Sequence, residues 1–276
     1  MKEKMTGYKI FRAILKPIYL LWYNPKIIGK ENIPKEGSIV VAGNHIHIMD
    51  QCNVIISTKR CLHYMAKKEY FDNSKVAWFF KAAGCIPVDR SKKDEEATSH
   101  ALEVLKEEEA LGIFPEGTRN ALKEERAKEL YDYYFEESTM EFPEFYEKTK
   151  NNRTSFVNYL EELYQKKFIS KEEFLDNIFD VDAFLKDLIL NHRMTKEEYY
   201  DHILLPLKFG AVSLAHKTDS LIVPYAITGD YKFRSKNLTV RIGEPFAIEG
   251  DLEKANKRLQ KEIRDLMMEN ENNSGK

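Results

Sequence analysis

Three short apolar runs in this chain each end in a polar turn, and this repeated pattern constrains the fold most strongly. The runs are SIVVA, GCIPV and ALGIF, and they lead into GNHIHIMD, DR and PEGTRN. Amphipathic helical patterns lie between them; KKDEEATSHALEVLKEEEA, for example, places Ala97, Ala101 and Val104 on one side. Because strands alternate with helices, we predict an α/β fold with a mostly parallel central sheet flanked by helices.

The chain changes character at Ala121 and returns to the sheet pattern near residue 204. Residues 121–203 include 12 basic and 20 acidic residues and 16 of the chain's 33 aromatic residues, without a convincing strand pattern. Helix starts at Ser170 and Thr195 are each followed three residues later by Glu, which fits the capping box. We therefore predict an all-helical insertion at 121–203 in an α/β domain formed by 27–120 and 204–276.

Residues 1–26 form a separate segment with an amphipathic helical pattern. In YKIFRAILKPIYLLWY, the cations Lys9, Arg12 and Lys16 share a narrow arc and apolar side chains cover most of the rest. The segment is too short and too charged to span a membrane, and it lacks the cleavage site of a secretory signal. On the pattern alone, residues 8–23 either lie in a membrane interface or pack on the protein's own core.

The formal net charge of −2 conceals an uneven distribution. Since 121–203 carries a net −8, the rest of the chain carries +6, which suits anionic ligands or an anionic lipid surface. We predict no nucleic-acid partner. Cys52, Cys61 and Cys85 are odd in number and lack CxxC spacing. We therefore expect reduced thiols in a cytoplasmic compartment, with neither a disulfide framework nor a thiolate zinc site.

The stretch GNHIHIMD, Gly43 to Asp50, is the first candidate site. If the strand continued through it, His45 and His47 would face the same side, as a metal-binding HxH pair requires. The sequence supplies no convincing further ligands, and we predict no metal. In a second interpretation, a turn brings Asp50 against His45, which acts as a general base. In a third, Asp50 caps the next helix and the histidines are polar loop residues.

Later strand ends favour proton transfer. Arg90 follows the GCIPV run, and Arg119 follows ALGIF. The carboxyl ends of parallel strands share one edge of a sheet, so both guanidinium groups can converge on His45. Arginine offers paired donors that match phosphate oxygens. The sequence thus predicts a phosphate site beside a general base.

These motifs resemble those of the 1-acyl-glycerol-3-phosphate acyltransferase family, which converts lysophosphatidic acid to phosphatidic acid. The family's histidine-x4-aspartate motif matches His45 to Asp50, and its second block matches Gly84 to Arg90. Its Phe-Pro-Glu-Gly-Thr-Arg block matches Phe114 to Arg119, and its apolar strand with an internal proline matches Leu221 to Ile227. All four occur in the family's order, with Ala66-Lys67-Lys68-Glu69 between the first two.

The resemblance implies residue roles. His45 would be the general base on the glycerol hydroxyl, and Asp50 would orient it. The residues implied to bind the acceptor are Asn44, Lys68, Arg90, Glu116, Gly117, Thr118 and Arg119. We assign no role to His47, where the family often has Ser.

The resemblance also implies a reaction without a cofactor. A fatty acyl group would pass from acyl-CoA or acyl carrier protein to the free hydroxyl of lysophosphatidic acid. The enzyme would be peripheral or monotopic, held at the cytoplasmic face of a membrane by residues 8–23. Because a thioester is already activated, a hydroxyl deprotonated by His45 can attack it directly, and the sequence fittingly has no GxSxG elbow.

Alternatives stay open at this point. The acceptor could be glycerol-3-phosphate or another lysophospholipid. From other classes, the chain could be a metal-dependent hydrolase using His45 and His47, or a non-catalytic membrane-binding module. The insertion at 121–203 departs from the family pattern. It can be interpreted as a satellite lobe with its own small core, or as a cover for the acyl tunnel, a partner-docking element or a subunit contact.

Overall fold

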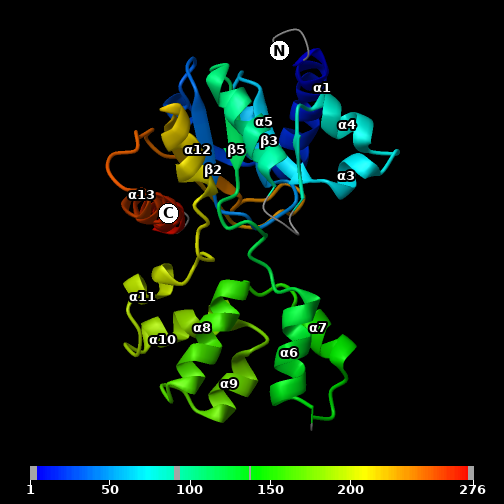
Figure 1. The fold of residues 1–276 in the computed structure, drawn as a ribbon. Coiled ribbons are helices and arrows are strands. Elements are labelled where there is room, and N and C mark those ends of the chain that lie inside the picture. Colours follow the sequence, from blue (N-terminus) through cyan, green and yellow to red (C-terminus); the bar gives the residue numbers. More distant parts are fainter. Residues whose placement is uncertain (1–4, 90–93, 137, 273–276) are drawn as a thin grey trace. The chain divides into compact units, whose positions relative to one another are not determined.

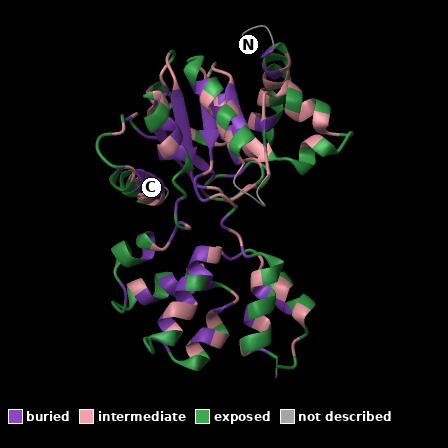
Figure 2. Ribbon diagram, viewed as in Figure 1, coloured by how far each residue is buried: buried purple, intermediate pink, exposed green. Residues whose placement is uncertain are grey.

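The computed structural model describes residues 5–89, 94–136 and 138–272 and divides into two compact units (Figure 1). Unit 1 comprises Met1–Gly117 and Leu207–Lys276, and unit 2 comprises Thr118–Pro206. Each unit has its own buried core, drawn in purple in Figure 2.

Unit 1 is built on a central sheet. Its described residues form seven strands in the order β1-β7-β6-β2-β5-β3-β4. These are β1 (Lys26–Ile28), β2 (Ile39–Gly43), β3 (Leu62–Lys67), β4 (Ile86–Val88), β5 (Ala110–Ile113), β6 (Leu221–Thr228) and β7 (Thr239–Ile242). Every neighbouring pair is parallel except β6 and β7, which are antiparallel. The predicted α/β fold with a mostly parallel sheet is confirmed.

Helices cover both faces of this sheet. One face packs against α5 (Glu95–Lys106), α12 (Gly210–Thr218) and α13 (Leu252–Asn272), and the other against α1 (Thr6–Tyr23) and α2 (Asp50–Ser57). Side chains alternate along a strand, so Tyr64 faces the α2 side while Met65 faces α5 and α12. The short elements are η2 (Lys30–Asn32), α3 (Glu69–Asp72) and α4 (Ala77–Ala82).

The connection between β6 and β7 is mostly irregular. In the described chain only Thr239–Ile242 forms a strand there, while Phe246 makes an isolated bridge to Ile222. The Ser235 hydroxyl accepts hydrogen bonds from the N–H groups of Asn237 and Leu238. Such local side-chain bonds compete with strand pairing just before β7.

Unit 2 is helical in its described residues. Its helices are α6 (Glu124–Tyr134), α7 (Phe142–Thr149), α8 (Thr154–Gln165), α9 (Lys171–Asn177), α10 (Val181–Leu190) and α11 (Lys196–Asp201). Phe145, Phe156 and Phe174 are fully buried in it. Ser170 and Thr195 each form the reciprocal capping box, in which the hydroxyl accepts from the N3 N–H and the Glu accepts from the cap N–H. The aromatic residues of this segment thus supply a core of its own.

Gly112 provides a test of sheet packing. A Cβ atom there would lie 2.3 Å from the ring of Tyr64, its partner on β3, so we expect Gly112→Ala to lower the free energy of unfolding by about 1–3 kcal/mol. Gly210→Ala, in open space at the first residue of α12, should leave it unchanged or raise it. Urea unfolding of both variants measures the difference, and equal stabilities would refute this packing.

Candidate active site

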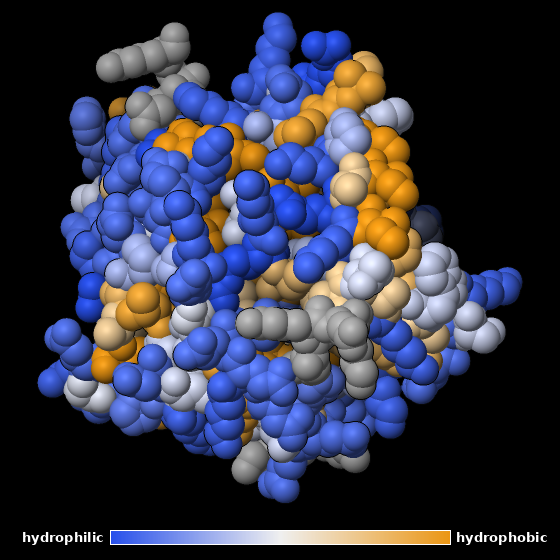
Figure 3. Space-filling view, turned by 90° about the horizontal axis from the view of Figure 1, so that it is seen from above, coloured by the Kyte–Doolittle hydropathy of each residue, from blue (hydrophilic) through white to orange (hydrophobic). Residues whose placement is uncertain are grey.

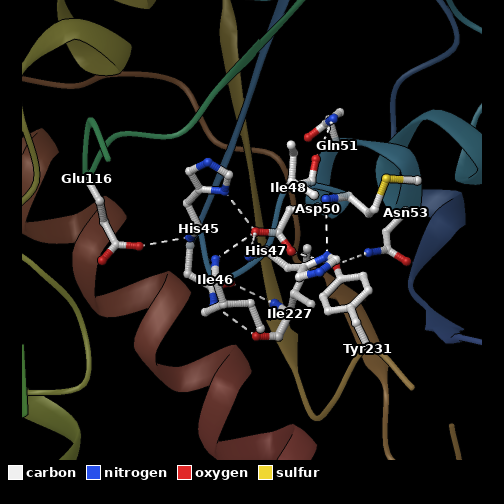
Figure 4. Close-up of polar contacts among 12 residues, drawn as sticks. His45, Ile46, His47, Ile48, Asp50, Gln51, Asn53, Glu116, Ile227 and Tyr231 are labelled. Atoms are coloured by element: carbon white, nitrogen blue, oxygen red, sulfur yellow. Dashed lines mark hydrogen bonds and ion pairs between the residues drawn. The ribbon is translucent and has the colours of Figure 1, made fainter. Parts of the chain in front are cut away.

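The site begins where β2 ends. β2 stops at Gly43, where a Cβ atom would lie 2.5 Å from the ring of Tyr225, and α2 begins at Asp50. The intervening turn brings His45 back onto Asp50: Nδ1 of His45 lies 2.8 Å from Oδ2 of Asp50 (Figure 4). The Asp50 side chain is fully buried, whereas that of His45 is 15% exposed. The structure therefore pairs an imidazole that solvent can reach with a carboxylate that it cannot.

Asp50 organises the turn around itself. Its Oδ2 also accepts hydrogen bonds from the N–H groups of Ile46 (2.6 Å) and His47 (2.8 Å), and its Oδ1 accepts from the Tyr231 hydroxyl (2.5 Å). These donors compensate for removing the carboxylate from water. The third interpretation, a plain helix cap, does not describe this arrangement, because the Asp50 carboxylate bonds to the turn before α2, to His45 and to Tyr231.

The His45 imidazole is fixed from three sides. Its ring stacks on Phe114, with centroids 3.9 Å apart and planes 15° apart. The main-chain N–H of His45 donates to Oε1 of Glu116 at 2.8 Å. Because the Asp50 carboxylate acts as a hydrogen-bond acceptor, it favours the His45 tautomer whose Nδ1 carries the proton and donates to it. Nε2 is then the nitrogen that can take a proton from another molecule.

His47 lies apart from this pair. Its ring stacks on Tyr231 with centroids 4.1 Å apart, and its Nδ1 accepts from the N–H of Met49 at 3.3 Å. Extended backbone ends at Gly43, so the condition for His45 and His47 to face one side is not met. Within the described ranges, no group of three His, Cys, Asp or Glu side chains is placed to hold a metal ion.

His45 opens onto a cavity of about 320 Å³ that lies wholly in unit 1. The end of β4, the start of α5, the turn after β5 and the start of α12 contribute its walls. Asp94, which also lines it, caps α5 through the N–H of Ala97 and accepts from the N–H of Asp89. Lys208 lies exposed at the rim, anchored by its main-chain N–H to the carbonyl of Pro115 at 2.8 Å.

Gly117 and Lys208 are packed against each other in this cavity. Gly117 has φ +72°, a conformation that favours glycine, and a Cβ atom there would lie 2.7 Å from Cε of Lys208. Gly117, expected from the sequence to bind the acceptor, thus lines the cavity. Its lack of a side chain also leaves the space that the Lys208 side chain occupies.

Two other expected acceptor-binding residues are engaged within the protein. Asn44 is buried, with its amide donating to the carbonyl of Ile227 at 2.8 Å and accepting from the N–H of Ile227 at 2.7 Å. It thereby extends the pairing of β2 with β6 past the strand end. Glu116 is buried and bonds to the main chain of His45. In this structure both residues position the turn that carries the imidazole.

The remaining expected residues are Lys68, Arg90, Thr118 and Arg119. Lys68 is exposed at the end of β3, where its main-chain N–H bonds to the carbonyl of Val88, and it does not line the cavity. Arg90 lies outside the described residues. Thr118 and Arg119 are the first residues of unit 2.

The structure adds site residues that sequence reasoning missed. Tyr231 bonds to Asp50, Phe114 stacks on His45, and Lys208 lines the cavity. Phe114 belongs to a recognised motif, but its stacking on His45 arises only when the tertiary structure brings the two residues together. Lys208 follows the insertion and Tyr231 follows β6, so no motif spacing connects either of them to His45.

Comparisons with known proteins agree with this geometry. The 1-acyl-sn-glycerol-3-phosphate acyltransferase of Bacillus subtilis (strain 168) is 36% identical over 115 residues, 41% of this chain and 58% of that protein. The enzyme of that name from Borreliella burgdorferi is 34% identical over 118 residues, 41% of this chain and 47% of that protein. This chain therefore spans about half the length of the curated relatives it matches.

A crystal structure shows the same fold. The 1-acyl-sn-glycerophosphate (LPA) acyltransferase PlsC from Thermotoga maritima matches with a TM-score of 0.55 at 17% identity, over 95% of this chain and 78% of that chain. The family model described as Acyltransferase matches residues 24–228, from the residue after α1 to the end of β6. With the paired His45 and Asp50 inside that match, the chain belongs to the acyltransferase family.

Proposed function

We propose that this protein transfers a fatty acyl group from an acyl thioester to the free hydroxyl of lysophosphatidic acid, giving phosphatidic acid. The observation that carries the proposal is the His45–Asp50 pair facing a cavity whose rim bears Lys208. The curated relatives are named 1-acyl-sn-glycerol-3-phosphate acyltransferases, which supports this acceptor. Acyl-CoA and acyl carrier protein both present the thioester that the chemistry needs.

The geometry supports direct transfer. The acceptor hydroxyl gives its proton to Nε2 of His45 while its oxygen attacks the thioester carbonyl carbon. The tetrahedral intermediate then expels the thiolate, which takes the proton from the imidazolium. Asp50, held by its other donors, keeps the ring oriented and stabilises its positive charge between the two proton transfers.

Lys208 is our proposed contact for the acceptor's phosphate. Its ammonium group lies at the rim of the cavity that His45 faces, at the end of the wall formed by Gly117. A lysine acts on phosphate as a point charge with three donors. Arg90 and Arg119, implied by the resemblance, would add the bidentate contacts that lysine cannot make.

A second cavity of unit 1 suits a fatty acyl chain. It measures about 350 Å³ and lies between α1, α2 and β3. Most of its lining is apolar, including Leu15, Ile55 and Phe79. Burial of methylene groups against such side chains is favourable by about 0.8 kcal/mol each. We infer that a lipid substrate places its hydrocarbon part here.

Helix α1 turns Arg12 and Lys16 toward the protein, beside the buried Tyr8 and Tyr19, and leaves most of its aliphatic side chains exposed. Nε of Arg12 donates to the carbonyl of Ile55 at 3.1 Å, and Nζ of Lys16 donates to that of Ile56 at 3.0 Å. Both carbonyls lie in the last turn of α2, where cations are favourable. This polarity is the reverse of a helix docked by its apolar face, and it supports membrane contact.

The exposed apolar residues extend beyond α1. They are Ile10, Ile14, Leu15, Ile18, Leu21 and Trp22 on α1, with Ile48, Trp78 and Phe233 from other segments of unit 1. Trp22 and Phe233 are in contact, with ring centroids 5.1 Å apart. Figure 3 shows hydrophobic side chains gathered along one side of the face that it displays. An exposed apolar surface of this kind fits an interface with lipid.

We therefore propose a peripheral or monotopic protein that binds the membrane through residues 8–23. None of the described helices is long and apolar enough to cross a bilayer. We propose the cytoplasmic face because the three cysteines are odd in number and lack CxxC spacing, which favours a reducing compartment.

The assigned base gives the first functional test. We expect His45→Ala to lower kcat/KM for acyl transfer to lysophosphatidic acid by about 100-fold or more, because the hydroxyl loses its proton acceptor. Asp50→Asn should also be strongly impaired, since an amide cannot hold the imidazolium as a carboxylate does. His216→Ala, an exposed histidine on α12, is the control. Full transfer by His45→Ala would contradict the assignment, and stoichiometric zinc in active protein would favour the hydrolase.

Lys208→Met tests the phosphate contact while keeping the packing against Gly117. We expect the KM for lysophosphatidic acid to rise about tenfold or more, because one charge-assisted hydrogen bond is lost. Lys217→Met, at the other end of α12, should behave as the wild type. Steady-state kinetics with varied acceptor measure this, and an unchanged KM for Lys208→Met would exclude the contact.

Charged substitutions test the membrane surface. Ile14 and Leu21 are 56% and 68% exposed, so Ile14→Glu and Leu21→Glu should fold normally yet bind phosphatidylglycerol vesicles about tenfold less tightly or worse. Leu190→Glu is the matched control, since Leu190 is 77% exposed on unit 2. Vesicle sedimentation gives the affinities. If all three variants bind as the wild type does, α1 is not the membrane contact.

A further inference from the structure

We propose that Tyr231 is a positioning residue for the reaction and that it connects Asp50, through Asn53, to Tyr19 on α1. The kinetic part of this inference rests on the proposed function, while the geometry of the His45–Asp50 pair can be tested without turnover. Neither the histidine-x4-aspartate motif nor the other matched blocks include Tyr231 or Tyr19.

The connection is a continuous chain of hydrogen bonds. The Tyr19 hydroxyl donates to Oδ1 of Asn53 at 3.0 Å, and Nδ2 of Asn53 donates to the Tyr231 hydroxyl at 2.6 Å. The Tyr231 hydroxyl donates to Oδ1 of Asp50 at 2.5 Å, as Figure 4 shows. Every donor points toward the carboxylate, and bonds aligned in this way polarise and strengthen one another.

The side chains that form this series of hydrogen bonds are largely removed from water. Tyr19 and Asn53 are buried, and Asp50 is fully buried. Burial, together with the negative charge of Asp50, raises the pKa of Tyr231 far above its ordinary value. Its hydroxyl therefore keeps its proton and remains a donor. In a site removed from water, a lost donor is not replaced at low cost.

The bond from Tyr231 acts together with the N–H groups of Ile46 and His47 to set the direction in which the carboxylate points. A carboxylate group can rotate about its Cβ–Cγ bond, and only one orientation aims Oδ2 at His45. Tyr231 holds Oδ1, the oxygen that His45 does not use. The Tyr231 ring is itself fixed by the stacked ring of His47 and by an edge contact with Tyr23 of α1, at 5.4 Å between centroids.

Helix α1 completes the arrangement. Tyr19 holds Asn53, and Arg12 and Lys16 hold the last turn of the same helix α2. The seating of α1 thus fixes both the end of α2 and the side chain that supports Tyr231. Since α1 also carries the exposed apolar surface, the geometry points to a physical connection between the membrane-facing helix and the general base.

Tyr231→Phe tests the positioning role, because it removes the hydroxyl and keeps the ring. We expect kcat to fall about 10- to 100-fold, since a hydrogen bond to a charged group is lost. The KM values should stay as in the wild type, because Tyr231 does not line the cavity at His45. Tyr225→Phe is the matched control, because Tyr225 is a buried tyrosine of β6 whose hydroxyl takes no part in this series of hydrogen bonds.

A spectroscopic readout separates positioning from general stability. The His45 Nδ1–H proton held by Asp50 should give a low-field proton NMR resonance, assigned by its loss in His45→Ala. We expect this resonance to shift or broaden in Tyr231→Phe and to stay unchanged in Tyr225→Phe. If the wild-type protein catalyses no acyl transfer, the proposed function is refuted. The NMR resonance would still decide whether Tyr231 positions Asp50.

The connection to α1 is tested by the more distant links. Asn53→Leu and Tyr19→Phe should lower kcat as well, with Tyr19→Phe losing about 2- to 10-fold, because a neutral hydrogen bond is removed. Vesicle binding should not change, since none of the exposed apolar residues is altered. Wild-type kcat in Tyr19→Phe would overturn the link to α1. Wild-type kcat and an unchanged resonance in Tyr231→Phe, or a change in KM alone, would overturn the positioning role.

Discussion

The buried carboxylate of Asp50 is the interaction on which the site depends. A charge fully removed from water must be met by donors, and here those donors come from the turn before α2, from His45 and from Tyr231. Meeting this requirement folds the turn back on itself. The imidazole is thereby placed with one nitrogen on the carboxylate and the other available for chemistry.

The same requirement explains why two residues expected to bind the acceptor also support the turn. Asn44 continues the backbone pairing of β2 with β6, and Glu116 accepts the main-chain N–H of His45. A base that must sit within hydrogen-bond reach of a hydroxyl gains from a rigid support. Lys208 then supplies a cation at the rim of the cavity from outside the recognised motifs.

Sequence patterns predicted the features that depend on local periodicity. The apolar runs at β2 and β5, the parallel sheet, and the capping boxes at Ser170 and Thr195 follow from residue spacing and are confirmed. The roles of Lys208 and Tyr231 depend on contacts between segments far apart in the chain, which no local pattern encodes.

The central claim concerns transfer of an acyl group to a phosphate-bearing lysolipid. The most direct measurement crosses a panel of lysophospholipids and glycerol-3-phosphate with acyl-CoA and acyl carrier protein thioesters, and identifies the products by mass spectrometry. We expect phosphatidic acid from lysophosphatidic acid, in preference to products from the other acceptors. Release of free fatty acid with every acceptor, or no product from any thioester, would contradict it.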